Sequence, residues 1–343
     1  MAILEIIQMA AGSFLVLGIL YNLLENGVES WEITLGGIIA LIIVISVLPV
    51  ILASPAPGSI PIPTPTATPM PTATPTPTAT PTPPPAPTPA GSPLGACAEI
   101  DVPGDYWLSG DVDADGNATC FLISTENVSM DCDYRDVFNG SGVAFSVTNF
   151  SNITIKNCDI YEFDYGISAS ISNDLTLNNN VILDCGTGVE AYDSIGAYIT
   201  QNIFINNSAV GMYLQEINDS GIALNYFQDN YDGLQGVDGH TNTYSTNDAV
   251  NNTHIGYKFE GENGSVFTHN DGWGNGGGSA YGFYLYNTTL NSFDNNTIEA
   301  SSAGDFYCET DPDDNVDAGD NACDSVNNCD WMNGTISTNC PPI

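Results

Sequence analysis

Residues 153–160 of this chain read ITIKNCDI and are followed by Gly166-Ile167. Apolar side chains alternate with polar ones in this stretch, as they do in a β-strand that buries one face. A strand this short cannot enclose a hydrophobic core by itself, so its buried face must pack against similar segments elsewhere in the chain. The stretch therefore predicts a repeated fold.

The pattern recurs at a nearly constant spacing. A glycine followed by an apolar or aromatic residue occurs at Gly142, Gly166, Gly188, Gly211, Gly233, Gly256 and Gly282. An asparagine column runs through Asn157, Asn179, Asn202, Asn225, Asn247, Asn270 and Asn295. Both columns predict coils of about 22 residues that stack around a shared apolar interior. We expect the asparagines to hydrogen-bond between coils, and the glycines to provide a left-handed turn between faces.

This repeat unit resembles that of the right-handed parallel β-helix family, over about residues 120–305. The resemblance implies an all-β right-handed parallel β-helix body. It does not define a function, because lyases, glycosidases, phage tailspikes, adhesins and coat components share the fold. The composition divides the chain into a hydrophobic anchor or assembly segment (1–53), a Pro/Thr-rich extended linker (54–93), the β-helix (94–305) and a disulfide-rich acidic C-terminal cap (306–343).

The N-terminal segment is predicted to form a hydrophobic α-helical hairpin from residues 2–24 and 33–53. The second run carries no charge along its whole length. Such a run is long enough to span a hydrocarbon layer of about 30 Å. Two interpretations stay open: a membrane hairpin, or helices that self-associate in a filament or virion coat. Glu5 in an apolar opening resembles type IV pilins, and the segment that ends in LPVILAS resembles coat proteins of archaeal spindle-shaped viruses.

The linker is dominated by proline, threonine and alanine. Proline fixes φ and removes backbone donors, so neither a helix nor a sheet is expected here. We expect an extended polyproline stalk, either O-glycosylated or unmodified.

Charge and cysteines restrict the partners and the compartment. The chain has 41 Asp and Glu against 3 Lys and Arg, a formal net charge of -38, which excludes a nucleic-acid-binding role. Its nine cysteines contain no CxxC pattern, so a zinc site is not expected. Cys132 and Cys158 occupy nearly equivalent positions of successive coils and are predicted to be bridged. A disulfide-linked cap is predicted from Cys308, Cys323, Cys329 and Cys340, and the odd total leaves one thiol free or intermolecular.

Twelve N-x-S/T sequons support an extracellular or cell-surface glycoprotein. They start at Asn117, Asn127, Asn139, Asn149, Asn152, Asn206, Asn218, Asn251, Asn263, Asn287, Asn295 and Asn333.

Two acidic runs are candidate Ca²⁺ sites, since they place oxygen ligands at alternate positions. The first run consists of Asp111, Asp113 and Asp115, before Gly116. The second resembles the acidic calcium repeats of thrombospondin type 3 and contributes Asp311, Asp313, Asn315 and Asp317, with Val316 in place of the usual glycine. The alternative interpretation of both runs is a solvated acidic turn.

Few residues indicate catalysis. Arg135, Lys156 and Lys258 fall in different columns, so they cannot form the basic cluster that a polysaccharide lyase needs. Outward carboxylates such as Asp159, Asp164, Asp184, Glu190 and Asp193 are interpreted as solvated, and the chain is predicted not to be an enzyme. Trp273 and Tyr281 flank a glycine-rich loop and are candidate carbohydrate-binding residues.

Three functions follow, in order of preference. The first is a structural subunit of a filament, surface layer or virion coat that self-associates through its N-terminal helices. The second is a membrane-anchored adhesin or carbohydrate-binding protein, and the third is a polysaccharide lyase or hydrolase. Apart from Ca²⁺, no cofactor is expected.

Overall fold

The computed structural model describes residues 92–276, 281–309, 315–319, 321–323, 326–327 and 329. The predicted helices of residues 1–53, and the linker up to residue 91, lie outside this part of the chain. Within the described residues every regular element is a β-strand, and no helix is long and apolar enough to cross a membrane.

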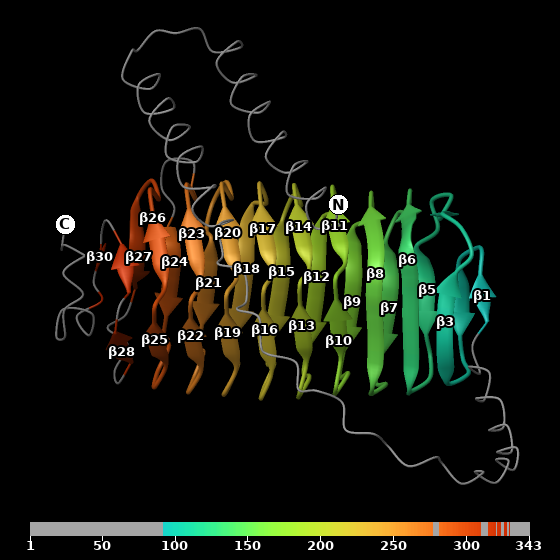
Figure 1. Ribbon diagram of the computed structural model, residues 1–343, viewed down its shortest axis with the longest axis horizontal. Coiled ribbons are helices and arrows are strands. Elements are labelled where there is room, and N and C mark those ends of the chain that lie inside the picture. Colours follow the sequence, from blue (N-terminus) through green and yellow to red (C-terminus); the bar gives the residue numbers. More distant parts are fainter. Residues whose placement is uncertain are drawn as a thin grey trace, which may run out of the picture. The chain divides into compact units, whose positions relative to one another are not determined.

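The strands form two parallel sheets whose members follow one another coil by coil (Figure 1). Sheet B has 11 strands: β2 (Ala98–Ile100), β5 (Thr119–Ile123), β7 (Val143–Thr148), β9 (Tyr165–Ser170), β12 (Thr187–Tyr192), β15 (Val210–Gln215), β18 (Asp232–Val237), β21 (Tyr257–Glu260), β24 (Tyr281–Tyr286), β27 (Gly304–Cys308) and β30 (Val326–Asn327). Each of these strands pairs with the matching strand of the coils before and after it, as a solenoid requires.

Sheet A has 19 strands, because the chain crosses it twice in most coils. Its first members are β1 (Pro93–Leu94), β3 (Gly104–Leu108), β4 (Val112–Asp113), β6 (Val128–Phe138), β8 (Ile153–Tyr161), β10 (Thr176–Asn178), β11 (Val181–Leu183), β13 (Tyr198–Thr200), β14 (Ile203–Ile205) and β16 (Gly221–Ala223). The others are β17 (Tyr226–Gln228), β19 (Thr243–Ser245), β20 (Asp248–Val250), β22 (Val266–Thr268), β23 (Asp271–Trp273), β25 (Ser292–Asp294), β26 (Thr297–Glu299), β28 (Val316–Gly319) and β29 (Ala322–Cys323).

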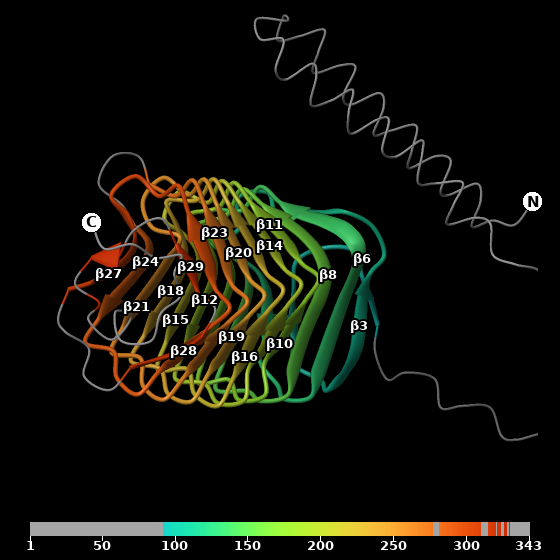
Figure 2. The same ribbon diagram turned by 60° about the vertical axis from the view of Figure 1, so that its left-hand side comes forward.

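The two sheets enclose the predicted apolar interior (Figure 2). Alternate residues of most strands are buried, and aromatic rings of successive coils stack on one another. Phe204 lies on Phe227 with ring centroids 5.0 Å apart, and Tyr244 lies on Phe267 at 4.8 Å. The all-β right-handed parallel β-helix body is therefore confirmed. Paired strands continue from residue 306 to Asn327, so coil pairing extends into the segment predicted to be a cap.

Asparagines form ladders at the bends of the coils, but the predicted column mixes two positions. The buried ladder runs through Asn180, Asn202, Asn225, Asn247, Asn270, Asn296 and Asn321. In each step the side-chain amide of one asparagine donates to Oδ1 of the next. Asn157, Asn179 and Asn295 instead lie one residue earlier, in left-handed backbone on the outer side of the bend. Because adjacent positions are both asparagine, sequence spacing could not separate the inner ladder from the outer one.

The glycines of the predicted column allow adjacent coils to pack closely, and they do not form the predicted left-handed turn. Gly188 and Gly211 have no positive φ; the left-handed positions belong mostly to Asn and Asp residues. A Cβ on Gly188 would lie 2.3 Å from the carbonyl oxygen of Gly211, so any side chain there would push adjacent coils apart.

Three disulfides in which both cysteines are described join neighbouring coils. The predicted Cys132–Cys158 bridge is present, together with Cys308–Cys329 and the unpredicted Cys97–Cys120. Cys323 is also disulfide-bonded, and Cys340 lies outside the described residues. Among the described cysteines only Cys185 is free, and it is buried. Burial raises the pKa of its thiol to about 11, so this thiol is protonated and unreactive at neutral pH.

Candidate functional site

A carboxylate pair lies on the outer face of sheet A. Asp248 opens β20 and Asp271 opens β23, and the two residues are direct partners in the parallel register. The residues that follow them, Ala249 and Gly272, are buried, so the two carboxylates project outward. Adjacent strands lie about 4.8 Å apart, which places the two carboxyl groups close to each other.

Aromatic side chains flank this pair. Tyr226 of β17 is the register partner of Asp248 on the other side, and its hydroxyl donates to Oε1 of Gln228 at 3.0 Å. Trp273 lies two residues beyond Asp271 in β23 and therefore points to the same face. Its exposed fraction is 55%. The arrangement combines two carboxylates with an exposed ring on which a ligand can stack.

The two carboxylates differ in environment. Asp248 is half-buried, and burial, followed by the negative charge of Asp271, raises its pKa above the ordinary range of an aspartate. Asp271 is exposed. A carboxylic acid that keeps its proton to higher pH, beside an exposed carboxylate, is the asymmetry that general acid catalysis requires.

A second pair occupies the same column at the start of the body. Asp136 of β6 and Asp159 of β8 are register partners, and burial together with the charge of Asp136 raises the pKa of Asp159. Here the neighbouring ring is engaged: the Tyr161 hydroxyl donates to Oδ2 of Asp136 at 3.2 Å, and the ring stacks on Phe138 at 5.3 Å. This second pair therefore lacks a free aromatic surface.

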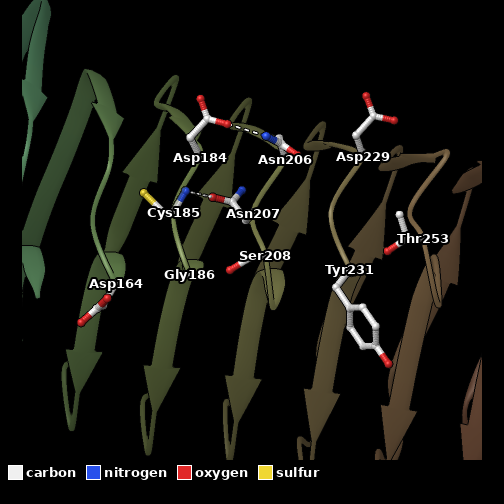
Figure 3. A pocket seen from close by; sticks show the side chains of 10 residues that line it. All are labelled: Asp164, Asp184, Cys185, Gly186, Asn206, Asn207, Ser208, Asp229, Tyr231 and Thr253. Carbon is white, nitrogen blue, oxygen red and sulfur yellow. Dashed lines mark hydrogen bonds between the residues drawn. The ribbon is translucent and has the colours of Figure 1, made fainter. Parts of the chain in front are cut away.

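An open polar groove follows the corner where β11, β14 and β17 end (Figure 3). Its volume is about 470 Å³, and it is lined by Asp164, Asp184, Cys185, Gly186, Asn206, Asn207, Ser208, Asp229, Tyr231 and Thr253. Asp184 accepts a hydrogen bond from the Asn206 amide at 2.5 Å, and Asp229 accepts one from the Gln228 amide at 2.8 Å. Since Gln228 belongs to β17, the groove adjoins the strand that carries Tyr226.

An imidazole–carboxylate contact lies beside this groove. Nδ1 of His254 is 2.7 Å from Oδ1 of Asp232, and the His254 ring stacks on Tyr231 with centroids 4.7 Å apart. Asp232 also accepts the backbone N–H of Ile255 at 3.0 Å. These contacts hold the His254 and Tyr231 rings in place at the edge of the groove.

The structure separates the two predicted carbohydrate-binding residues. Trp273 lies on sheet A beside the carboxylate pair, whereas Tyr281 opens β24 of sheet B and stacks on Tyr307 at 4.3 Å. The Asp248–Asp271 pair itself was missed by sequence reasoning. The only available signal was that both aspartates directly follow an asparagine of the buried ladder, Asn247 or Asn270.

The described asparagines of the predicted sequons lie outside the strands. The exposed asparagines are Asn117, Asn127, Asn139, Asn149, Asn152, Asn206, Asn251 and Asn287; the half-buried ones are Asn218, Asn263 and Asn295. Asn333 lies outside the described residues. Asn206 and Ser208 of one sequon line the corner groove, so a glycan attached there would occupy the groove.

The candidate calcium ligands that the structure describes take part in hydrogen bonds. Asp113 accepts from the backbone N–H of Asp115 at 2.9 Å, and Asp111 accepts from that of Asp136 at 3.3 Å. Asn315 is buried and its Oδ1 accepts the N–H of Asn291 at 2.9 Å. Asp317 accepts from the Asn321 amide at 2.7 Å; Asp311 and Asp313 lie outside the described residues. No described group of three His, Cys, Asp or Glu side chains has a geometry that could hold a metal.

Solved structures with a similar fold come from several kinds of protein. The DFA-IIIase of Arthrobacter chlorophenolicus A6, in complex with GF2, matches at 11% identity and a TM-score of 0.42, over 61% of this chain and 72% of that one. A mutant of the periplasmic alginate epimerase AlgG matches at 14% identity and a TM-score of 0.45, over 67% and 71%. The Dettilon tailspike protein matches at 12% identity and a TM-score of 0.42, over 69% and 60%. A comparison with curated protein sequences finds no match.

These likenesses concern the fold alone, but they correct one prediction. The prediction that the chain is not an enzyme is wrong, because this fold does not exclude catalysis. The solved structures that share the fold include an alginate epimerase and the catalytic domain of Agl-KA. Residues 141–298 match the family model described as right handed beta helix region, and the body of this chain is a right-handed parallel β-helix of that type.

Proposed function

We propose that the body is a glycoside hydrolase that acts on an extended polysaccharide at the Asp248–Asp271 pair. The observation that supports this most strongly is the register of β20 and β23, which sets two carboxylates side by side next to the exposed ring of Trp273. Glycosidic bonds are hydrolysed by such paired carboxylates, one protonated and one ionised.

The separation of the carboxylates favours hydrolysis with retention of configuration. Neighbouring strands about 4.8 Å apart match the roughly 5–5.5 Å found between carboxyl groups of retaining enzymes, and not the wider gap of inverting ones. In this scheme Asp271 attacks the anomeric carbon, while Asp248 donates its proton to the departing glycosidic oxygen. Asp248 then takes a proton from water, which attacks the same carbon and releases the sugar from Asp271.

The surroundings favour a neutral or cationic substrate. Asp248 and Asp271 lie on a chain of formal net charge -38, so a polyanion such as a polyuronate would be repelled. Both Asp271 and Trp273 are exposed, so an extended polymer can lie across the strands without entering a deep pocket. Trp273 would stack on the face of a sugar ring next to the cleaved bond.

The test is hydrolysis of a panel of neutral polysaccharides, such as cellulose, chitin, β-glucan and mannan, by wild type and matched variants. Asp248→Asn and Asp271→Asn should each lower kcat by at least about a hundredfold. Asp159→Asn, which changes the other acidic pair, should leave kcat unchanged. Release of reducing ends that is equal in wild type and Asp248→Asn, or no release from any of these substrates, would overturn the proposal.

The structural-subunit and adhesin functions require separate tests. Disulfides and sequons are compatible with an extracellular surface glycoprotein. A role as a filament or coat subunit depends on residues 1–53, which lie outside the described residues. Detergent extraction followed by electron microscopy would distinguish ordered assemblies from dispersed monomers. An adhesin without catalysis would bind the same polysaccharides and leave them uncleaved.

A further inference from the structure

The interior of the body changes directly behind the Asp248–Asp271 pair. In other coils the inward residue at this position of sheet A is large, as at Ile182, Phe204, Phe227 and Ile298. At β20 and β23 the inward residues are instead Ala249 and Gly272. The space that these two small residues leave has to be filled from the opposite sheet, because protein interiors contain few voids.

Tyr257 of sheet B fills this space. The inward residues at its position in other coils are Val189, Met212, Leu234, Phe283 and Phe306, none of which can donate a hydrogen bond from its side chain. Tyr257 is buried, its ring stacks on Phe283 with centroids 4.7 Å apart, and a Cβ on Gly272 would lie 3.5 Å from its Cε2 atom. Tyr257 therefore brings a hydroxyl to a position that is apolar in those coils.

The Tyr257 hydroxyl meets the backbone at both members of the carboxylate pair. Its oxygen lies 2.6 Å from the carbonyl oxygen of Asn247 and 2.7 Å from that of Asp271. The Asn247 carbonyl belongs to the peptide bond before Asp248, and it also accepts the N–H of Asp271 at 2.8 Å. Because a single hydroxyl proton serves both carbonyls, this contact ties β20 to β23 at the level of the two carboxylates.

The pair needs such a tie because its members repel each other when both are ionised. Their other neighbours in the register are Tyr226 and Thr297, so within the described strands no third carboxylate adjoins the pair in this column. Burial, followed by the charges of Asp248 and Asp271, raises the pKa of Tyr257. The hydroxyl therefore keeps its proton at neutral pH and remains a donor.

We propose that Tyr257 is a positioning residue that holds the Asp248 and Asp271 carboxylates at a fixed separation from inside the coil. Without the hydroxyl, two buried carbonyl groups lose a donor, and repulsion between the carboxylates can widen the gap between β20 and β23. The interaction between two charges weakens as their distance grows. The inference concerns the geometry of the pair, and its consequence for catalysis rests on the proposed hydrolysis.

The test is a carbon NMR titration of the aspartate carboxyls in the full-length protein, in detergent micelles. The change that Asp271→Asn causes in the pKa of Asp248 is measured in wild type and in Tyr257→Phe, as a double-mutant cycle. We expect this change to be at least about a third smaller in Tyr257→Phe, because the carboxylates lie farther apart. The matched control is Tyr244→Phe, which removes a buried hydroxyl that lies 3.3 Å from Oε1 of Glu262 and should leave the change as in wild type.

A second measurement needs no variant, and so does not depend on whether Tyr257→Phe folds. In wild type, the Cζ carbon of Tyr257 should shift with the same midpoint as the carboxyl carbon of Asp248, because the hydroxyl contacts the adjoining peptide group. The proposal is overturned if Cζ does not shift, or if Tyr257→Phe and Tyr244→Phe alter the effect of Asp271→Asn equally. It is also overturned if Asp271→Asn leaves the pKa of Asp248 unchanged in wild type.

Turnover separates the positioning role from the proposed function. With a polysaccharide that wild type hydrolyses, Tyr257→Phe should lower kcat by about tenfold with little change in KM, whereas Tyr244→Phe should retain the wild-type kcat. If wild type hydrolyses nothing and the coupling still weakens in Tyr257→Phe, the proposed function fails and the positioning role stands. If Tyr257→Phe keeps both the coupling and the wild-type kcat, the positioning role fails and the proposed function stands.

Discussion

The backbone N–H of Cys185 donates a hydrogen bond to Oδ1 of Asn207 at 3.1 Å (Figure 3). In the next coils the residue at this position is asparagine: Asn207, Asn230, Asn252 and Asn275 each receive the same bond from the coil before. The free thiol thus occupies the first place of an asparagine ladder. Cys158 holds the corresponding place before Asn180 in the other ladder, where it is bridged to Cys132.

Replacing Cys185 with asparagine should therefore extend the ladder by one coil. The new amide would donate to Oδ1 of Asn207 and to the carbonyl of Ile160, as Asn207 does to Asn230 and Ile182. We expect a gain of about 1 kcal/mol in the free energy of unfolding, measured by urea denaturation. Cys185→Ala, whose side chain has neither a donor nor an acceptor, serves as the control and should not stabilise the protein.

Removing an asparagine from the middle of the ladder should be severe. The Asn230 side chain donates to Phe204 and Asn252 and accepts from Asn207. Asn230→Ala leaves these buried groups unpaired, with an expected cost of about 2–4 kcal/mol. Asn178→Ala, at a half-buried position on the outer face, should cost less than about 1 kcal/mol. Equal losses in the two variants would contradict a structural role for the ladder.

The Cys132–Cys158 disulfide should stabilise the early coils, because it restricts the unfolded chain. The sequence separation of the two cysteines is 26. For a loop of this size, removal of the link should cost about 2–4 kcal/mol. The double variant Cys132→Ala/Cys158→Ala should show this loss in urea denaturation under oxidising conditions. In a strong reductant its stability and that of wild type should converge, because the bridge is then absent from both proteins.

Glu262 makes stability fall as the pH rises. Its Oε1 accepts bonds from Ser265 at 2.6 Å and Asn242 at 2.9 Å, while Oε2 is buried without a partner. Burial is the largest cause that raises the pKa of this carboxyl group in the folded state. In the unfolded chain this carboxyl group has the ordinary pKa of glutamate, about 4.3. Because its pKa is higher in the folded protein, the group contributes its full stabilisation below pH about 4.3. This stabilisation is lost as the pH rises through the pKa of the folded state.

The measurement is the urea midpoint at acidic and neutral pH. Between about pH 4 and pH 8, the decrease in stability should be smaller in Glu262→Gln than in wild type, because glutamine does not titrate. Glu126→Gln, at an exposed position, should follow the wild-type curve. Parallel curves for wild type and Glu262→Gln would show that the buried carboxyl group does not titrate over this range.

The proposed hydrolysis should depend on pH through Asp248. Its raised pKa keeps it protonated at pH values where an ordinary aspartate is ionised, and activity should decline as the pH rises through that raised value. Asp271→Asn removes one of the two causes of the shift, so the pKa of Asp248 should fall while burial still holds it above the ordinary value. A carbon NMR titration of the aspartate carboxyls, with Asp159→Asn as the control, would measure this without requiring turnover.

The periodicity of Gly142 to Gly282 was enough to predict the fold, because the solenoid's contacts repeat at a fixed sequence distance. The same regularity made Cys132–Cys158 predictable, since the two cysteines fall one coil apart. It did not reveal why glycine is required. A side chain at Gly188 is excluded by contact with the backbone of Gly211 in the next coil. The residues next to Gly188 in the sequence do not predict this contact.

The candidate sites were decided by the tertiary structure. Asp248 and Asp271 become a pair only when β20 and β23 align, and a register shift of one residue would turn one carboxylate inward. Tyr257 likewise reaches the backbone of this pair only because it lies across the interior from it, on the opposite sheet. The sequence by itself determined the coil and its apolar interior, because burial imposes a period. Which outward side chains meet was set by the stacking of coils, because that contact depends on register between segments far apart in the chain.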